Sequence, residues 1–112
     1  MIQSSPSQIP QEIEPAFKQR CDVVYNGWHE GSMIFKNAVD ALLEMENEQV
    51  SAGQYANQGL AENRIGMMYG YRGDLDLSIR HFARARDLFE RANNRAQIVR
   101  TIMNLGESYR QK

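Results

Sequence analysis

A short motif that occurs twice, 40 residues apart, constrains the fold of this chain more than any other feature of its sequence. Ile-Gly-x-x-Tyr at residues 65–69 returns as Leu-Gly-x-x-Tyr at residues 105–109. Both copies lie in segments whose apolar residues recur every three or four positions, which indicates helices with one buried face. A glycine inside a helix costs about 1 kcal/mol relative to alanine and needs a structural reason. We predict that Gly66 allows two helices to approach closely, with Ser78 as the small residue opposite it.

Apolar stripes of helical spacing predict five helices. They are expected over residues 10–31 with Pro10 or Pro15 in the first turn, then 33–48, about 52–72, about 75–92 and about 96–109. Ser32 and Asp74 are the expected N-caps of the second and fourth helices, and asparagines form the turn at 93–95. No segment alternates with period two. Helices joined by such short turns must lie antiparallel to their neighbours, so we predict an all-α, antiparallel helix-pair solenoid of two pairs plus a lone C-terminal helix. It would occupy residues 10–112, after a flexible N-terminal segment at 1–9.

Charge and composition exclude several classes of function. The formal net charge is −1, so no basic excess indicates nucleic-acid binding or attraction to a membrane surface. No apolar run approaches the roughly 20 residues that span a bilayer. The N-terminus lacks the charged and apolar regions of a signal peptide, and a single cysteine, Cys21, excludes an intramolecular disulfide. We expect a cytoplasmic protein.

Nothing in the sequence predicts catalysis, a metal site or a cofactor. The two histidines, His29 and His81, stand alone, and we expect both to be structural or exposed to solvent. Glu44, Glu46 and Glu48 alternate by two, which spreads them around a helix. We therefore assign them to a solvated face and not to a catalytic carboxylate pair. We expect a protein that is not an enzyme.

The chain resembles the tetratricopeptide repeat family, in a longer variant of about 40 residues similar to that of kinesin light chain and of bacterial peptide-sensing regulators. The residues that carry the resemblance are Ile65, Gly66, Tyr69, Gly73, Asp74, Ser78, Phe82 and Ala85, followed by Asn104, Leu105, Gly106 and Tyr109. Residues 13–61 match the pattern loosely. Ser78 stands where the family usually has alanine, and Glu62 lies near a position where a large aromatic residue is common.

The resemblance implies a non-enzymatic module that binds a peptide or protein segment. The first helix of each pair lines the concave side in this family, and an asparagine at the position of Asn104 often holds the peptide backbone of the ligand. Arg64 occupies the equivalent position one repeat earlier. Met67 is expected to face the groove and Met68 the core. The expected groove residues are Asn63, Arg64, Met67, Tyr71, Arg100, Met103, Asn104 and Glu107.

The fifth helix would have no partner helix of its own pair. Repeats of this kind bury their faces only against neighbours, so an exposed edge is expected to pair with something. The expected edge residues are Ile98, Ile102, Leu105 and Tyr109. This leaves two alternatives open, a homodimer that forms through this edge and a regulatory or sensory fragment of a longer signalling protein.

Overall fold

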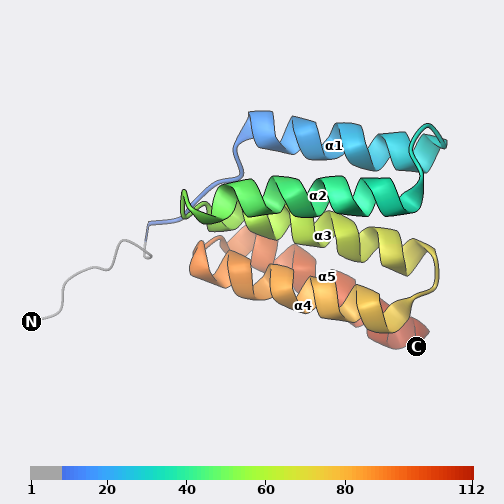
Figure 1. The fold of residues 1–112 in the computed structure, drawn as a ribbon. Coiled ribbons are helices and arrows are strands. Elements are labelled where there is room, and N and C mark those ends of the chain that lie inside the picture. The colour runs from blue at the N-terminus through green and yellow to red at the C-terminus, as the bar shows by residue number, and fades with distance from the viewer. Residues whose placement is uncertain (1–8) are drawn as a thin grey trace, which may run out of the picture.

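The computed structural model describes residues 9–112 and has five antiparallel helices, with no strand among these residues (Figure 1). The helices are α1 (Pro15–Glu30), α2 (Phe35–Val50), α3 (Tyr55–Tyr71), α4 (Leu75–Arg91) and α5 (Arg95–Gln111). Turns of three or four residues join them, and each helix packs on the next. The predicted fold class, an all-α array of antiparallel helices, is confirmed. The segment expected to be flexible lies outside the described residues except for residue 9.

Residues with a left-handed backbone end the helices where the sequence predicted turns. Gly31 follows α1 with φ 93°, Gly73 follows α3 with φ 84°, and Asn93 follows α4 with φ 54°. Glycine adopts this region without strain, and asparagine tolerates it better than most residues. Pro15 occupies the first turn of α1, where its missing N–H is not needed.

One of the two predicted N-caps is wrong, and the other is confirmed in position. The N-cap of α2 is Ile34, and the Ser32 hydroxyl instead donates to the Gly27 carbonyl at 3.1 Å, which helps to close α1. Asp74 is at the N-cap position of α4, but its side chain makes no capping hydrogen bond. Side-chain type therefore identified the N-cap position of α4 but not that of α2.

Helix α3 lies at the centre of the molecule and packs against all four other helices. It is buried on nearly every side, and its buried residues include polar ones such as Asn57 and Glu62. Met68 is fully buried and Met67 is not, as the sequence predicted. The main apolar cluster joins α1, α2 and α3 through Phe17, Cys21, Ala38, Val39, Leu42, Met45, Leu60, Ala61, Ile65 and Met68.

Two glycines let α4 press directly against α3. A Cβ on Gly66 would lie 2.8 Å from the ring of Phe82, and one on Gly59 would lie 2.7 Å from the ring of Phe89. The predicted close approach at Gly66 is therefore confirmed, but the residue that covers the glycine is Phe82. Ser78 has another role, because its hydroxyl donates to the Gly66 carbonyl at 2.9 Å.

Segment 9–14, here called the N-terminal strap, ties the two turns at one end of the molecule to α1. The Gln11 N–H donates to the Ala92 carbonyl and the Gln11 carbonyl accepts from Asn94 Nδ2, both at 2.8 Å. The Gln11 side chain donates to the Gly53 carbonyl and accepts from the Ala56 N–H. The main-chain and side-chain polar groups of Gln11 thus both hold the strap in place.

Gly66→Ala is expected to destabilise the protein, because the added methyl group would collide with Phe82. The loss from overpacking, about 1–3 kcal/mol, exceeds the gain of about 1 kcal/mol in helix propensity. Gly106→Ala is the matched control: nothing lies within 4 Å of a Cβ at Gly106, so only the gain should remain. Urea unfolding of the two variants and the parent protein measures both effects. Equal stabilisation by both changes would contradict the close contact at Gly66.

Asn94→Asp removes the strap contact of this side chain but keeps its role as the cap of α5. The Asn94 side-chain oxygen accepts from the Gln97 N–H and caps α5, and a carboxylate can still do so. The amide donor to Gln11 is lost, so we expect the free energy of unfolding to fall by about 1–2 kcal/mol. Asn26→Asp, at an exposed site on α1, carries the same change in charge. Thermal unfolding that shifts equally for both variants would show that the strap contact does not stabilise the fold.

Candidate functional site

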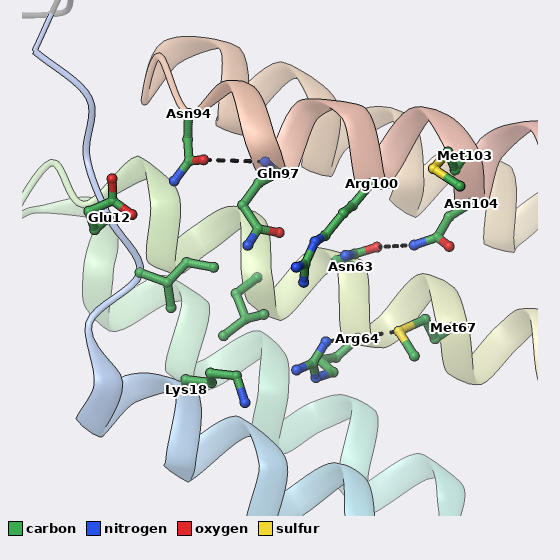
Figure 2. A pocket seen from close by; sticks show the side chains of 12 residues that line it. Glu12, Lys18, Asn63, Arg64, Met67, Asn94, Gln97, Arg100, Met103 and Asn104 are labelled. Carbon is green, nitrogen blue, oxygen red and sulfur yellow. Dashed lines mark hydrogen bonds between the residues drawn. The ribbon is translucent and has the colours of Figure 1, made fainter.

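Two adjoining hollows form a groove along the face made by α1, α3 and α5. The first has a volume of about 470 Å³ and lies near the strap, and the second, of about 330 Å³, lies toward the C-terminal ends of α3 and α5. Met67 and Asn104 line both hollows, so the two lie side by side. Figure 2 shows how side chains of α1, α3 and α5 converge on the first hollow.

All eight residues predicted to line a groove do line these hollows. The first hollow is bordered by Asn63, Arg64, Met67, Arg100, Met103 and Asn104, and the second by Met67, Tyr71, Asn104 and Glu107. Helical spacing explains the agreement, because these residues recur on one side of α3 and on the matching side of α5. Whether they bind a ligand stays a prediction.

Two asparagines bridge α3 and α5 at the floor of the first hollow. Asn104 Nδ2 donates to Asn63 Oδ1 at 3.2 Å (Figure 2). Asn63 is buried, whereas Asn104 is partly exposed. Each amide keeps hydrogen-bonding capacity beyond this one bond, since a side-chain amide offers two donors and an acceptor oxygen. The pair can therefore hold the two helices together and still offer polar atoms to the hollow.

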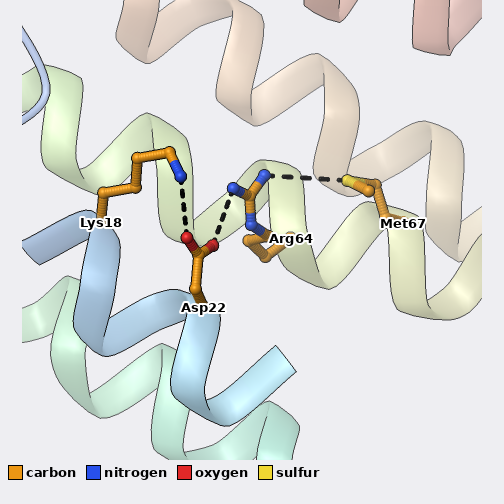
Figure 3. A network of polar contacts seen from close by, with 4 residues as sticks. All are labelled: Lys18, Asp22, Arg64 and Met67. Atoms are coloured by element: carbon orange, nitrogen blue, oxygen red, sulfur yellow. Dashed lines mark hydrogen bonds and ion pairs between the residues drawn. The ribbon is translucent and has the colours of Figure 1, made fainter. Parts of the chain in front are cut away.

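Arg64 is held rigidly at the edge between α1 and α3 (Figure 3). Its guanidinium donates to Asp22 Oδ1 at 3.0 Å and lies 3.9 Å from the sulfur of Met67. Lys18 donates to the other oxygen of Asp22 at 2.8 Å. Partial burial opposes the charge of Asp22, but these two hydrogen bonds outweigh it and hold the pKa of Asp22 below its usual range. Arg64 and Lys18 thus already share one carboxylate.

Arg100 is different, because it has no hydrogen-bond or ion-pair partner among residues 9–112. It is exposed and borders the first hollow together with Gln97 of the same helix. An arginine can bind a carboxylate through two parallel hydrogen bonds. Its guanidinium is therefore the cation of the groove that is free to bind an acidic group.

The second hollow is lined mainly by apolar and aromatic side chains. Tyr25, Tyr71, Leu75 and Phe82 border it. Tyr71 is exposed, and its ring meets that of Trp28 edge to face at a centroid distance of 5.8 Å. The groove thus passes from amides and cations at one end to aromatic rings at the other.

Sequence reasoning missed the contribution of α1 and of the strap to this groove. Lys18 and Tyr25 of α1 and Glu12 and Ile13 of the strap line it, and Asp22 fixes its edge. A signal was present: Asp22 precedes Val24 by two residues, as Asn63 precedes Ile65. The loose repeat match of α1 could therefore have placed Asp22 on the same face as Asn63.

The residues predicted to form an exposed edge do not all share one environment. Leu105 is only 7% exposed and belongs to the buried side of α5, and Ile98 is half-buried. Ile102 and Tyr109 are largely exposed. The exposed side of α5 therefore does not include Leu105. It is formed by Ile102 and Tyr109 together with Val99, which is also exposed.

A buried polar cluster on the other side of α3 was also missed. Glu62 is fully buried, with Oε1 2.6 Å from His81 Nδ1 and Oε2 3.3 Å from Arg84 Nη2. The carboxyl group of Glu46 on α2 is hydrogen-bonded to it and is itself buried. The assignment of Glu46 to a solvated face is wrong, because the stripe that packs α2 against α3 is wide enough to include it. His81 is structural, as predicted, and its ring stacks on Tyr69.

The pKa values of the two carboxyl groups in this cluster are shifted in opposite directions. Burial, with the hydrogen bond and charge of Glu62, raises the pKa of Glu46 to about 9. Burial also opposes ionisation of Glu62, but hydrogen bonds with His81 and Glu46 and the charge of Arg84 outweigh it and lower its pKa. Glu62 is therefore the ionised member at neutral pH, and Glu46 is the neutral member that donates to it.

Comparison with protein-family models, with curated proteins and with solved structures found no match to this chain. Among residues 9–112, no helix is long and apolar enough to cross a membrane. The same residues contain no group of three or more histidine, cysteine, aspartate or glutamate side chains arranged to hold a metal ion.

Glu46 makes the stability of the protein depend on pH. In the unfolded chain it releases its proton near pH 4.5, but in the folded protein it keeps the proton to about pH 9. The folded state therefore binds the extra proton, and stability should fall between these values by up to about 1.4 kcal/mol per pH unit. Glu46→Gln keeps a neutral donor to Glu62 and should be more stable than the parent at pH 8, with a flatter profile. Urea unfolding from pH 5 to 8 measures this, with exposed Glu44→Gln as the control. A parallel profile for Glu46→Gln would contradict the assignment.

Proposed function

We propose that this protein is a non-enzymatic interaction module that binds a peptide or protein segment in the groove formed by α1, α3 and α5. The observation that carries the proposal is a groove made of two adjoining hollows with different linings. The polar end has amides and the unpaired Arg100, and the other end has the exposed ring of Tyr71 and the half-buried ring of Tyr25. Clefts with a largely apolar lining and a few convergent polar groups are the usual form of a binding site.

The chemistry of the groove favours a segment of extended backbone. Asn104, Asn63 and Gln97 offer side-chain amides, which can both donate to and accept from a peptide group. Arg100 would bind an acidic side chain or a terminal carboxylate. Tyr71 and Tyr25 would contact an apolar side chain at the other end.

The groove also has a rigid frame, which reduces the cost of binding. Arg64 is fixed by Asp22 and Met67, and the Asn63–Asn104 bond joins α3 to α5. Side chains that are already ordered lose little conformational entropy when a ligand arrives. We further propose membership of the tetratricopeptide repeat family, which the 40-residue motif offset supports. A cytoplasmic location is supported by the single unpaired Cys21.

Selection of displayed random 12-residue peptides on the parent protein, followed by titration of the enriched peptides, tests this function. We expect Arg100→Ala to weaken binding about 10-fold or more, since a hydrogen bond to a charged group contributes about 1.5–3 kcal/mol. Asn104→Ala should weaken binding by about 5-fold on the same scale. Fluorescence anisotropy with the labelled peptide at nanomolar protein concentrations gives the affinities.

Arg95→Ala is the matched control, because Arg95 is an exposed arginine on the same helix that does not border either hollow. Its affinity should stay within about twofold of the parent value. Thermal unfolding of each variant shows that the fold is intact. Peptides that bind Arg100→Ala and Asn104→Ala as tightly as the parent protein would contradict binding in the groove.

A further inference from the structure

The repeated motif allows a direct comparison between a covered face and an uncovered one. On α3, the face that contacts α4 carries Gly59, Glu62, Gly66 and Tyr69. There α4 contributes Phe89 against Gly59, His81 and Arg84 against Glu62, Phe82 against Gly66, and His81 against Tyr69. With the 40-residue offset, the corresponding residues of α5 are Val99, Ile102, Gly106 and Tyr109.

This face of α5 is open among the described residues. Val99 is 51% exposed, Ile102 50% and Tyr109 62%. Nothing lies within 4 Å of a Cβ built on Gly106, whereas its counterpart Gly66 is covered by an aromatic ring. The four residues form an apolar stripe with a gap at the glycine, which we call the α5 stripe.

A helix like α4 would not fit the α5 stripe. Val99 stands in place of Gly59 and fills the space that Phe89 needs. Ile102 stands in place of Glu62, so a histidine and an arginine at the positions of His81 and Arg84 would be buried without an acceptor. Such unpaired polar groups oppose binding. A partner that fits the stripe must therefore place a bulky residue opposite Gly106, an apolar residue opposite Ile102 and no large ring opposite Val99.

A second copy of α5, running in the opposite direction, meets these requirements. We propose that two copies of this chain associate through the α5 stripe about a two-fold axis near residue 104. In this arrangement Ile102 of each copy fills the gap at Gly106 of the other. Tyr109 of each copy packs beside Val99 of the other. A two-fold interface must be self-complementary, and here each Ile102 lies opposite a Gly106 and each Tyr109 lies opposite a Val99.

Arg100 and Glu107 lie outside this contact. At about 100° per residue, both are roughly 130° around α5 from the centre of the stripe, on the side that borders the groove. The contact between the two copies therefore leaves Arg100 free for a ligand of the groove.

The size of the contact predicts its strength. One helix on each side is smaller than the standard interface of about 800 Å² per partner. Interfaces below that size belong to weak and transient complexes. The dimer should therefore dissociate in the micromolar range and be monomeric at nanomolar concentrations.

Sedimentation equilibrium of the parent protein from 1 µM to 1 mM tests the association. We expect a shift from monomer to dimer across this range. Gly106→Ala is the informative variant, because the methyl group meets nothing in the monomer but would collide with Ile102 of the second copy. It should raise the melting temperature of the monomer and weaken the dimer by at least tenfold. Ile102→Lys should leave only monomer, whereas Val23→Lys, at an exposed site on α1, should dimerise like the parent.

A parent protein that stays monomeric at 1 mM would overturn the proposal. So would a dimer with the same dissociation constant in Gly106→Ala and Ile102→Lys.

Disulfide trapping tests the antiparallel register separately. Equal amounts of Val99→Cys and Tyr109→Cys proteins are mixed and oxidised. The native Cys21 is buried and does not compete. The mixed dimer should form several-fold faster than either homodimer, because residues 99 and 109 face each other across the axis. Faster formation of either homodimer would contradict this register.

Discussion

The contact between α3 and α4 across two glycines determines how the rest of the molecule is arranged. Gly59 and Gly66 let two phenylalanine rings of α4 rest on the backbone of α3, and Ser78 ties the two helices with a hydrogen bond to the Gly66 carbonyl. This close approach holds α3 at the centre, where α1 and α2 pack on one side and α4 and α5 on the other. The groove follows from it, because α1, α3 and α5 are then left with parallel faces on one side of the molecule.

The groove and the α5 stripe are adjacent but chemically distinct surfaces. The groove has amides, the free cation Arg100 and aromatic rings, whereas the stripe is apolar with a gap at Gly106. Arg100 and Glu107 belong to the groove side of α5. In a dimer formed through the stripe, the two grooves would open on the same side, because an antiparallel two-fold axis keeps corresponding flanks together. A ligand with two copies of a binding segment would then gain affinity from both sites.

Much of this arrangement could be predicted from the sequence, because helical periodicity and turn residues are local signals. The five helices, the left-handed turn at Asn93 and the groove side of Met67 all follow from spacing within one helix. What the sequence did not reveal depends on pairs far apart in the chain. The strap is held by Gln11 and Asn94, 83 residues apart, and the Glu46–Glu62 pair forms only when α2 packs on α3. Which α4 residue lies opposite Gly66, Phe82 or Ser78, likewise depends on how far α4 is shifted along α3. Composition does not determine that shift.

Under our proposal, a peptide or protein segment binds to the face made by α1, α3 and α5. Nuclear magnetic resonance of the labelled protein, titrated with a peptide selected on it, tests this most directly. We expect the largest shifts at the side-chain amides of Asn63, Asn104 and Gln97 and at the backbone around Met67 and Tyr71. Shifts confined to the exposed residues of α2 and α4, on the opposite side of the molecule, would contradict it.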